Sequence, residues 1–377
     1  MPVYVVGALS VEMRRSLAFG PGALGLAVGL YFLGAAASSI PFSRLAERVG
    51  GGRVMRVSSA LEAGLLLTIA AFAASSVELA VLLAATGVVS GAIMPATYLF
   101  LARRVEPGRQ GRAFGINQAA VPLAPLLGGL AVPFVALTVG WRWAFVIAAG
   151  LALVASGIVP TSLSSLSERR QARREAPPAT VAVLPLVVLS AGLGLGMFAA
   201  SGILAFLAAG AVSGGFSRAD AGFLVASVGA VAVVGRIVVG IRADHRSGEY
   251  LRIVAAMAGL GSFGYLLMAA GEQTHVRWLF LIAALLATGF GWSWNALFNL
   301  SVVRSHLQAP AKATGITDVG GRLGGVAGPV VAGQIVAHGS YPLAWATMGA
   351  AAFGAAGALL AGRRLLGHSG LSREVNL

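Results

Sequence analysis

Residues 43–53 read Ser-Arg-Leu-Ala-Glu-Arg-Val-Gly-Gly-Gly-Arg, and this charged turn separates two long apolar segments. The segments are residues 22–42 and 57–75, and Glu62 is the one charged residue within them. A helix needs about 20 apolar residues to cross the hydrocarbon core of a bilayer. The stretch therefore predicts two membrane-spanning helices that are joined by a short basic turn.

The same alternation of apolar segments and short polar turns continues to the end of the chain. It predicts eleven complete spans, at residues 22–42, 57–75, 79–101, 113–138, 143–160, 183–209, 221–241, 253–271, 278–302, 314–337 and 343–361. The chain is 57% hydrophobic and 11% charged, whereas a soluble domain is about one quarter charged. We therefore expect an all-α integral membrane protein, and the composition excludes a soluble enzyme.

Arginine and lysine gather in every second turn. Of the 27 basic residues, 20 lie in the turns at 43–56, 103–112, 162–182, 242–252 and 304–312 and in the tail from Gly362. Loops that stay in the cytoplasm retain Lys and Arg. We therefore predict that these turns and the C-terminus are cytoplasmic, at the plasma membrane, where they face anionic lipid headgroups.

Several kinds of partner and chemistry are excluded by the same composition. The net charge of +14 is spread over membrane-flanking turns without interleaved aromatic residues, so we expect no nucleic-acid partner. The chain has no cysteine, and its five histidines fall in predicted turns or the tail, so we expect no metal site. Gly192-x-Gly194-x-Gly196 lies inside an apolar segment, and no phosphate-binding loop is present. We expect no cofactor and no enzymatic activity.

Residues 1–10 are apolar but only about half as long as a span, and they lack the features of a signal peptide. We interpret them as the outer half of a first helix that is truncated. Two explanations stay open, a start codon placed too far downstream or a shortened protein. The alternation of basic turns favours twelve helices in the original chain.

The longest polar stretch, residues 162–182, predicts a flexible cytoplasmic linker, because its Ser, Arg, Glu and Pro residues bury too little surface to fold. It divides the chain into transmembrane halves at residues 1–161 and 183–361, and residues 362–377 form a cytoplasmic tail. At an offset of 200 residues, Arg104 matches Arg304, Gly115-Ile116 matches Gly315-Ile316, Leu123 matches Leu323, and Gly128 matches Gly328. These matches predict two pseudo-symmetric six-helix halves around a central cavity.

The turn at residues 43–53 resembles the loop between the second and third helices of the major facilitator superfamily, Gly-x-Leu-Ala-Asp-Arg-x-Gly-Arg-Arg. Residues 140–145, Gly-Trp-Arg-Trp-Ala-Phe, resemble that family's turn between helices five and six. Arg236-x-x-x-Gly240-x-x-Ala243-Asp244 resembles the equivalent loop of the second half. The resemblance covers almost the whole chain and implies a secondary transporter that works by alternating access.

By this resemblance the two loops control which side of the membrane the solute reaches. A carboxylate beside arginines at a helix end forms charge-assisted bonds that break when the halves move. The alternative is a solvated turn that follows only the positive-inside rule. The candidate gating residues are Arg44, Glu47, Arg48, Gly50, Arg53, Arg236 and Asp244. The family's first glycine is here Ser43, its aspartate is Glu47, and its next basic positions are Gly51 and Gly52. We therefore expect gating that is either weakened or differently tuned.

Two further segments resemble the family's antiporter motif, Gly-x-x-x-Gly-Pro-x-x-Gly-Gly. They are Ala120-x-x-x-Ala124-Pro125-x-x-Gly128-Gly129 and Gly324-x-x-x-Gly328-Pro329-x-x-Ala332-Gly333. Small residues four apart allow close contact between helices, so helix packing is the alternative to antiport. The arginine of the family's proton-coupled subfamily is absent from the predicted fourth helix, where Leu83 stands.

Four ionisable residues fall inside apolar segments, where a charge is costly and so tends to face a cavity or a partner. Asp318 and Arg322 are four apart and predict either a self-neutralising pair or a proton or substrate site. Glu62 is a further proton-coupling candidate, unless it reaches Arg56. Arg236 is expected to extend to the membrane surface.

Polar and aromatic residues predict the lining of the central cavity. Trp292, Asn295 and Asn299 fall on one face of a continuous helix. By the family resemblance and the repeat, the other candidates are Tyr98, Asn117, Gln118, Met197, Phe198 and Ser201. The alternative for each is hydrogen bonding between helices. A lining with few charges suits a small, moderately apolar or weakly charged solute.

These observations favour a monomeric secondary transporter of a small organic solute. Proton-coupled efflux, driven by the proton gradient, is our leading hypothesis, and proton-coupled uptake is the alternative. A membrane-embedded enzyme is disfavoured because no nucleophile–base pair is recognisable. A transport-inactive sensor or scaffold remains a further alternative.

Overall fold

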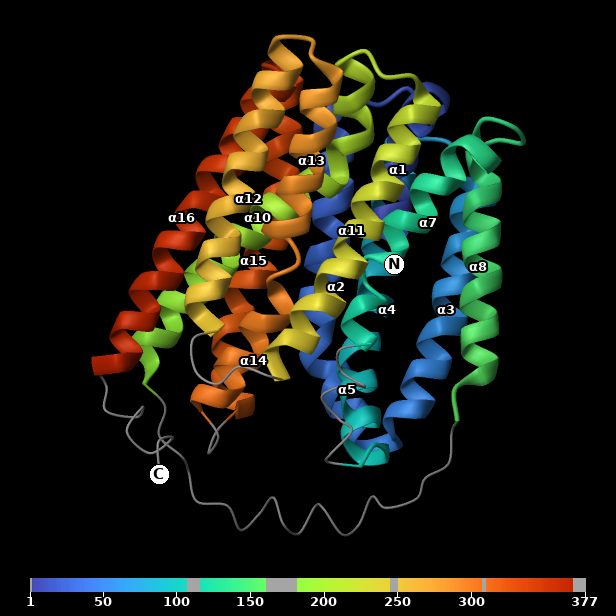
Figure 1. Ribbon diagram of the computed structural model, residues 1–377. Coiled ribbons are helices and arrows are strands. Elements are labelled where there is room, and N and C mark those ends of the chain that lie inside the picture. The colour runs from blue at the N-terminus through green and yellow to red at the C-terminus, as the bar shows by residue number, and fades with distance from the viewer. Residues whose placement is uncertain (1, 107–115, 161–181, 245–249, 307–309, 369–377) are drawn as a thin grey trace.

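The computed structural model describes residues 2–106, 116–160, 182–244, 250–306 and 310–368, and every regular element among them is a helix (Figure 1). The elements of the first half are α1 (Pro2–Leu17), α2 (Pro21–Val49), α3 (Gly51–Phe72), α4 (Ser76–Ser90), α5 (Ile93–Arg104), α7 (Leu123–Ala131), the π-helical turn η2 (Val132–Ala136) and α8 (Trp141–Ile158). Those of the second half are α10 (Val183–Ser213), α11 (Arg218–Asp244), α12 (Tyr250–Gln273), α13 (Arg277–Gly291), α14 (Asn295–Ser305), α15 (Pro310–His338) and α16 (Tyr341–His368).

The described helices form a multi-pass membrane bundle. By length and hydropathy, nine stretches of the described chain can each cross a bilayer, and α4–α5 together form one of them. The α13–α14 pair and α15 run alongside these spans (Figure 1). Helix α1 has 16 residues and begins about halfway along the bundle. The prediction of an all-α membrane protein with many apolar spans is therefore confirmed.

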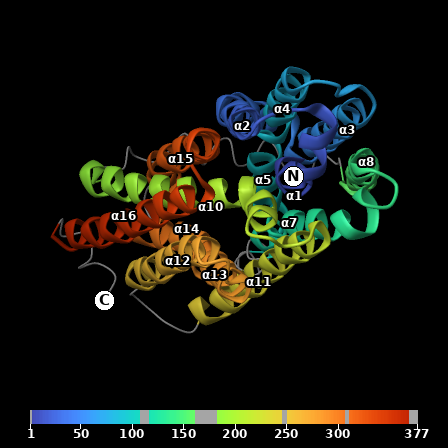
Figure 2. The same cartoon turned by 90° about the horizontal axis from the view of Figure 1, so that it is seen from above.

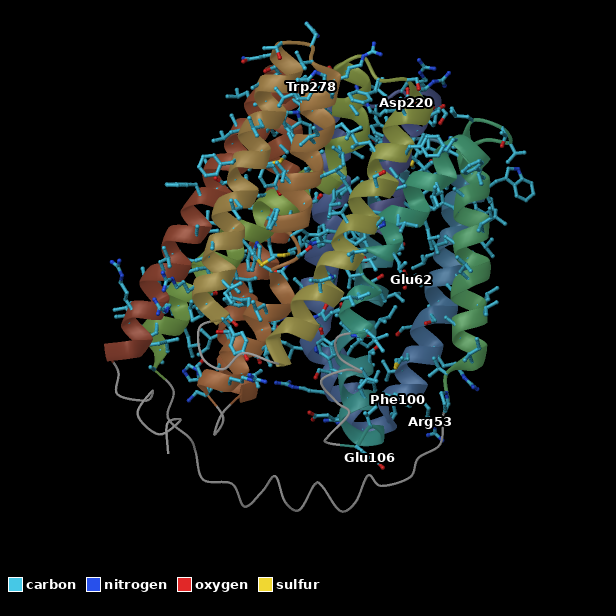
Figure 3. The ribbon with its side chains drawn as sticks, viewed as in Figure 1. Arg53, Glu62, Phe100, Glu106, Asp220 and Trp278 are labelled. Atoms are coloured by element: carbon cyan, nitrogen blue, oxygen red, sulfur yellow. The ribbon has the colours of Figure 1, made fainter. Side chains whose placement is uncertain are left out.

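Basic turns gather at one end of the bundle. Figure 3 shows Arg53 and Glu106 at that end and Asp220 and Trp278 at the other. We call these the arginine-rich end and the arginine-poor end. The predicted linker at residues 162–182 lies almost entirely outside the described residues. The tail was predicted to begin at residue 362, but α16 continues to His368.

Helices α2 and α3 extend well beyond their apolar segments. Helix α2 has 29 residues, which is about 43 Å, whereas the hydrocarbon core is about 30 Å thick. The charged turn that hydropathy predicted is therefore mostly helical. Only Gly50 interrupts it, with a φ of 97° that a residue with a side chain rarely adopts.

Seen from above, the two halves lie side by side (Figure 2), and three pairs of helices make the most extensive contacts between them. Helix α2 packs against α15, α7 against α11, and α1 against α10. The halves are also broken at nearly equivalent points, since α4 ends at Ser90 and α13 ends at Gly291, an offset of 201 residues. Two pseudo-symmetric halves, as predicted from the repeat, are therefore present.

Glycines bring the halves into backbone contact toward the arginine-poor end. A Cβ atom on Gly25 of α2 would collide with the carbonyl oxygen of Pro329 in α15. A Cβ atom on Gly7 of α1 would collide with the carbonyl oxygen of Leu204 in α10. Gly129 of α7 lies in the same way against α11, where its Cβ would be 2.6 Å from the carbonyl oxygen of Gly222. The two halves therefore approach more closely than side chains would allow.

We predict that Gly25→Ala destabilises the protein. The added methyl group would meet the Pro329 carbonyl and would lie 3.0 Å from the Cα of Gly333, an overpacking that costs about 1–3 kcal/mol. Thermal unfolding of the purified protein in detergent measures the effect. Gly64→Ala is the matched control, because nothing lies within 4 Å of its Cβ position. Equal unfolding temperatures for the two variants would contradict the prediction.

Candidate functional site

Arg236 lies between the halves, about two turns before the end of α11, and only 6% of its surface is exposed. Its Nη1 donates a hydrogen bond of 2.7 Å to the backbone carbonyl oxygen of Gln118 in the first half. Its guanidinium carbon lies 4.6 Å from the centre of the Trp292 ring, a cation–π distance. The side chain therefore does not extend to the membrane surface as the sequence suggested, because buried partners hold it inside the bundle.

Tyr4 packs against Trp292. The two ring centroids are 5.9 Å apart, and the exposed fraction of Tyr4 is 8%. Tyr4 belongs to α1 in the first half, whereas Trp292 belongs to the break between α13 and α14. The sequence analysis did not identify Tyr4, although it is the one tyrosine in its apolar segment.

A hydrogen bond between Tyr98 and Gln118 joins α5 to the start of the span at Ile116–Ala136. The Nε2 of Gln118 donates a hydrogen bond of 2.8 Å to the Tyr98 hydroxyl oxygen. Arg236 and Asp318 are among the charged groups near Tyr98. We call Tyr4, Tyr98, Gln118, Arg236 and Trp292 the central cluster. It draws on both halves, as a site that opens alternately to the two sides requires.

Two amides beside the central cluster have unused hydrogen-bonding capacity in the described structure. The Nδ2 of Asn117 and the Oδ1 of Asn295 are buried and have no hydrogen-bond partner there. The Nδ2 of Asn295 donates to the sulfur of Met197 at 3.3 Å. Buried polar atoms are nearly always paired in folded proteins, so each of these two atoms is a candidate for contact with a ligand or water.

Trp292, Asn295 and Asn299 do not lie on one continuous helix. Helix α13 ends at Gly291 and α14 begins at Asn295, so Trp292 lies in the break between them. The spacing in the sequence did not show this break, because the i, i+3, i+7 pattern assumes a continuous helix, although Gly289 and Gly291 lie just before it. Asn299 is half-buried on α14.

Ser201 and Phe198 contribute to packing between α10 and α15. The Ser201 hydroxyl donates to the carbonyl oxygen of Met197 at 2.8 Å, and its exposed fraction is 3%. Gly328 lies against Phe198 and Ser201, with no room for a side chain. Ser201 therefore does not line an open space, because the small residues of α15 allow the two backbones to enclose it.

Asp318 and Arg322 are both exposed, and they lie within α15, away from both of its ends. The Nη2 of Arg322 donates a hydrogen bond of 2.8 Å to the hydroxyl of Ser39 in α2. This hydrogen bond therefore reaches the other half. Arg322 also lies near enough to Asp318 for electrostatic attraction, as the i, i+4 spacing suggested. Asp318 acts electrostatically on Tyr98 of the first half.

Glu62 is buried in α3, with an exposed fraction of 6% (Figure 3). Tyr31 of α2 is the tyrosine on which it acts electrostatically. Arg56, the neighbour suggested by the sequence, instead donates a hydrogen bond of 2.9 Å to the carbonyl oxygen of Val159 beyond α8. Glu62 is thus enclosed within the first half.

The family model for the Major Facilitator Superfamily matches residues 3–317. The chain belongs to this family. Among its relatives is a protein of Agrobacterium vitis named "Putative tartrate transporter", which is 26% identical over 368 residues that cover 88% of this chain and 79% of the relative. An "Uncharacterized MFS-type transporter" of Mycobacterium tuberculosis is 28% identical over 346 residues, 86% of this chain and 73% of the relative.

Solved structures of the superfamily share the fold. The D-xylose–proton symporter superposes with a TM-score of 0.74 at 16% identity, covering 95% of this chain and 93% of that protein. A bacterial homologue of the human lysosomal transporter Spinster, in an inward-facing and occupied conformation, gives a TM-score of 0.72 at 16% identity, with coverage of 96% and 93%. Identity at this level supports the fold alone.

The superfamily loop between α2 and α3 places its charged side chains on the surface. Arg44, Glu47, Arg48 and Arg53 are exposed, and Figure 3 shows Arg53 at the arginine-rich end. Asp244, in the equivalent loop of the second half, is the last residue of α11, and its side chain lies outside the described part of the structure.

Gly51 and Gly52 replace basic residues of the superfamily loop for a steric reason. A Cβ atom on Gly51 would lie 2.6 Å from the carbonyl oxygen of Ala96 in α5. One on Gly52 would collide with the carbonyl oxygen of Pro160, beyond the end of α8. These glycines allow α3 to begin in close contact with two neighbouring segments.

The residues of the two antiporter-like motifs lie at helix contacts. A Cβ on Gly128 would be 3.3 Å from α1, and Gly129 packs against α11. Gly324 packs against α10. Pro125 is buried in α7, and the carbonyl oxygen of Pro329 contacts Gly25. Both motifs therefore hold helices together, and Gly129 and Pro329 do so between the halves.

An ion pair that the sequence analysis did not anticipate joins the halves at the arginine-poor end. Arg218, at the start of α11, lies 3.1 Å from both carboxylate oxygens of Glu12 in α1. The residues are 206 positions apart, so only the packing of the halves could reveal the pair. It breaks if the halves separate at this end.

We predict that Glu12→Gln exposes the α1–α10 contact at the arginine-poor end. The natural chain has no cysteine, so Ala205→Cys gives a single reporter there, at a side chain only 2% exposed. A partly exposed ion pair contributes up to about 1 kcal/mol, which corresponds to an increase of up to about fivefold in the rate of maleimide labelling. Asp220→Asn is the control, because Asp220 bonds only to Ser217 of its own turn in the described structure. Equal labelling rates would refute this role of the pair.

Proposed function

We propose that this chain is a secondary active transporter that exports a small organic solute across the plasma membrane in exchange for protons. The observation that carries the proposal is the central cluster, in which residues of both halves enclose Arg236. In alternating access, such a cluster faces each side of the membrane in turn. We further propose that no cofactor and no catalytic step are involved, and that the monomer in the lipid bilayer is the functional unit.

The positive-inside rule supports the proposed orientation, with the arginine-rich end and the C-terminus in the cytoplasm. Export is favoured because Pro125, Gly128 and Gly129 retain the second part of the antiporter motif in α7, which contacts α11 through Gly129. Import with protons is the alternative. Two relatives from Agrobacterium vitis bear the name of a tartrate transporter, so hydroxylated carboxylates such as tartrate are the first solutes to test.

Asp318 is the proposed proton carrier. It is an exposed carboxylate on α15, and it acts on Tyr98 of the opposite half. A carboxylate that titrates at this place changes the interaction between the halves when it binds a proton. Arg322, four residues further along α15, donates a hydrogen bond to Ser39 of α2 and so adds a second contact between the halves.

Flux into proteoliposomes tests the function, with the solute that most raises the unfolding temperature in a screen beginning with tartrate. Exchange of solute for protons predicts that the solute accumulates in the vesicles when their lumen is more acidic than the medium. Import of solute together with protons predicts accumulation when the medium is more acidic than the lumen. Asp318→Asn should abolish accumulation against a gradient but preserve exchange of labelled for unlabelled solute. Asp220→Asn, an exposed aspartate in the first turn of α11, is the control.

Accumulation only with an acidic exterior would replace export by import. Unchanged coupling in Asp318→Asn would overturn its role as the proton carrier. If no solute that stabilises the protein crosses the membrane under either gradient, the chain is not a transporter, and a sensor or scaffold explains the binding.

A further inference from the structure

Arg236 is a buried cation without a carboxylate partner in the described structure. In the described structure it contacts a backbone carbonyl oxygen and the face of an indole ring. The ionisable side chains that act on it electrostatically are those of Tyr4 and Tyr98, which are neutral near pH 7. A guanidinium does not lose its proton in a protein, so burial without an anion is costly.

The free edge of the guanidinium has the right shape for an anion. Nη1 is engaged by Gln118, and Nε is buried without a hydrogen-bond partner. Nε and Nη2 lie on the same edge of the group, where their N–H bonds are parallel. Two parallel donors match the two oxygens of a carboxylate and bind it in a bidentate manner.

The surroundings of Arg236 limit the size and polarity of the ligand. Trp292 covers one face of the guanidinium, and Tyr4 lies against Trp292. Asn117 precedes Gln118, and its Nδ2 is a buried donor without a partner. Asn295 follows the same break as Trp292, and its Oδ1 is a buried acceptor without a partner. One donor and one acceptor suit a hydroxyl group on a short carbon chain.

From these contacts we propose that Arg236 binds the carboxylate of a small organic anion, and that Asn117 and Asn295 bind its hydroxyl groups. The inference rests on the proposed function, because it assigns the solute of that same central cluster. A bound anion supplies the negative charge that would balance the Arg236 guanidinium. The site with its ligand is therefore closer to neutral than the empty site. The site therefore selects by charge first and by hydroxyl pattern second.

Calorimetric binding to the purified protein tests the charge selection directly. Lactate and succinate are compared with propane-1,2-diol and butane-1,4-diol, neutral molecules of the same carbon chain length. We expect at least one of the carboxylates to bind and the diols to bind at least tenfold more weakly. Binding of the diols as tight as that of the carboxylates would overturn the inference.

Substitutions locate the site. Arg236→Gln should weaken carboxylate binding by at least tenfold, and Arg236→Lys, which keeps the charge but not the parallel donors, should lose less. Arg142→Gln is the matched control, because Arg142 also stacks on a tryptophan, at 4.7 Å, and donates to the carbonyl oxygens of Ala70 and Ala73. It lies at the start of α8, at the arginine-poor end.

Carboxylate binding by Arg236→Gln equal to that of the natural protein would contradict the assignment. If that variant does not fold, the comparison of carboxylates with diols and the Arg236→Lys variant decide the question. Transport of a neutral solute without carboxylate binding would overturn the inference and leave the transporter intact. Carboxylate binding without any flux would overturn the proposed function and leave the anion site intact.

Discussion

Backbone contact between the two halves is the constraint on which the rest of the structure depends. Gly7, Gly25 and Gly129 allow α1, α2 and α7 to lie directly against helices of the second half. In a bilayer, no hydrophobic force drives helices together, so close packing supplies the attraction. A contact made by smooth glycine surfaces can also separate as a unit, which suits two halves that move as rigid bodies.

These contacts bring the central cluster together. Arg236 reaches the carbonyl oxygen of Gln118 only because α11 packs against α7. Tyr4 reaches Trp292 only because α1 packs against α10 and α11. Movement of the halves therefore changes the partners of Arg236 directly. The Glu12–Arg218 pair and the Arg322–Ser39 hydrogen bond join the halves at two further levels.

Hydropathy predicted an all-α membrane protein with many apolar spans, because the bilayer imposes a length on every apolar segment. It could not locate helix ends, since polar residues such as Arg44 and Arg48 continue α2 beyond the hydrocarbon. It also missed the break at Trp292. Arg236, Asn295 and Asp318 were recognised as unusual in a membrane segment, but the partners of Arg236 and Asn295 lie about 100 positions away. Such contacts follow from packing between the halves, so no local pattern encodes them.

The most direct test of alternating access uses a reversible bond between the halves. A Cβ on Gly22 of α2 would lie 3.8 Å from the Cβ of Ala337 in α15, which is about the mean separation in a disulfide. The natural chain has no cysteine to interfere. In the Gly22→Cys/Ala337→Cys variant, oxidation should abolish solute flux and reduction should restore it, because the arginine-poor end can no longer open. Undiminished flux through the fully cross-linked protein would contradict the account.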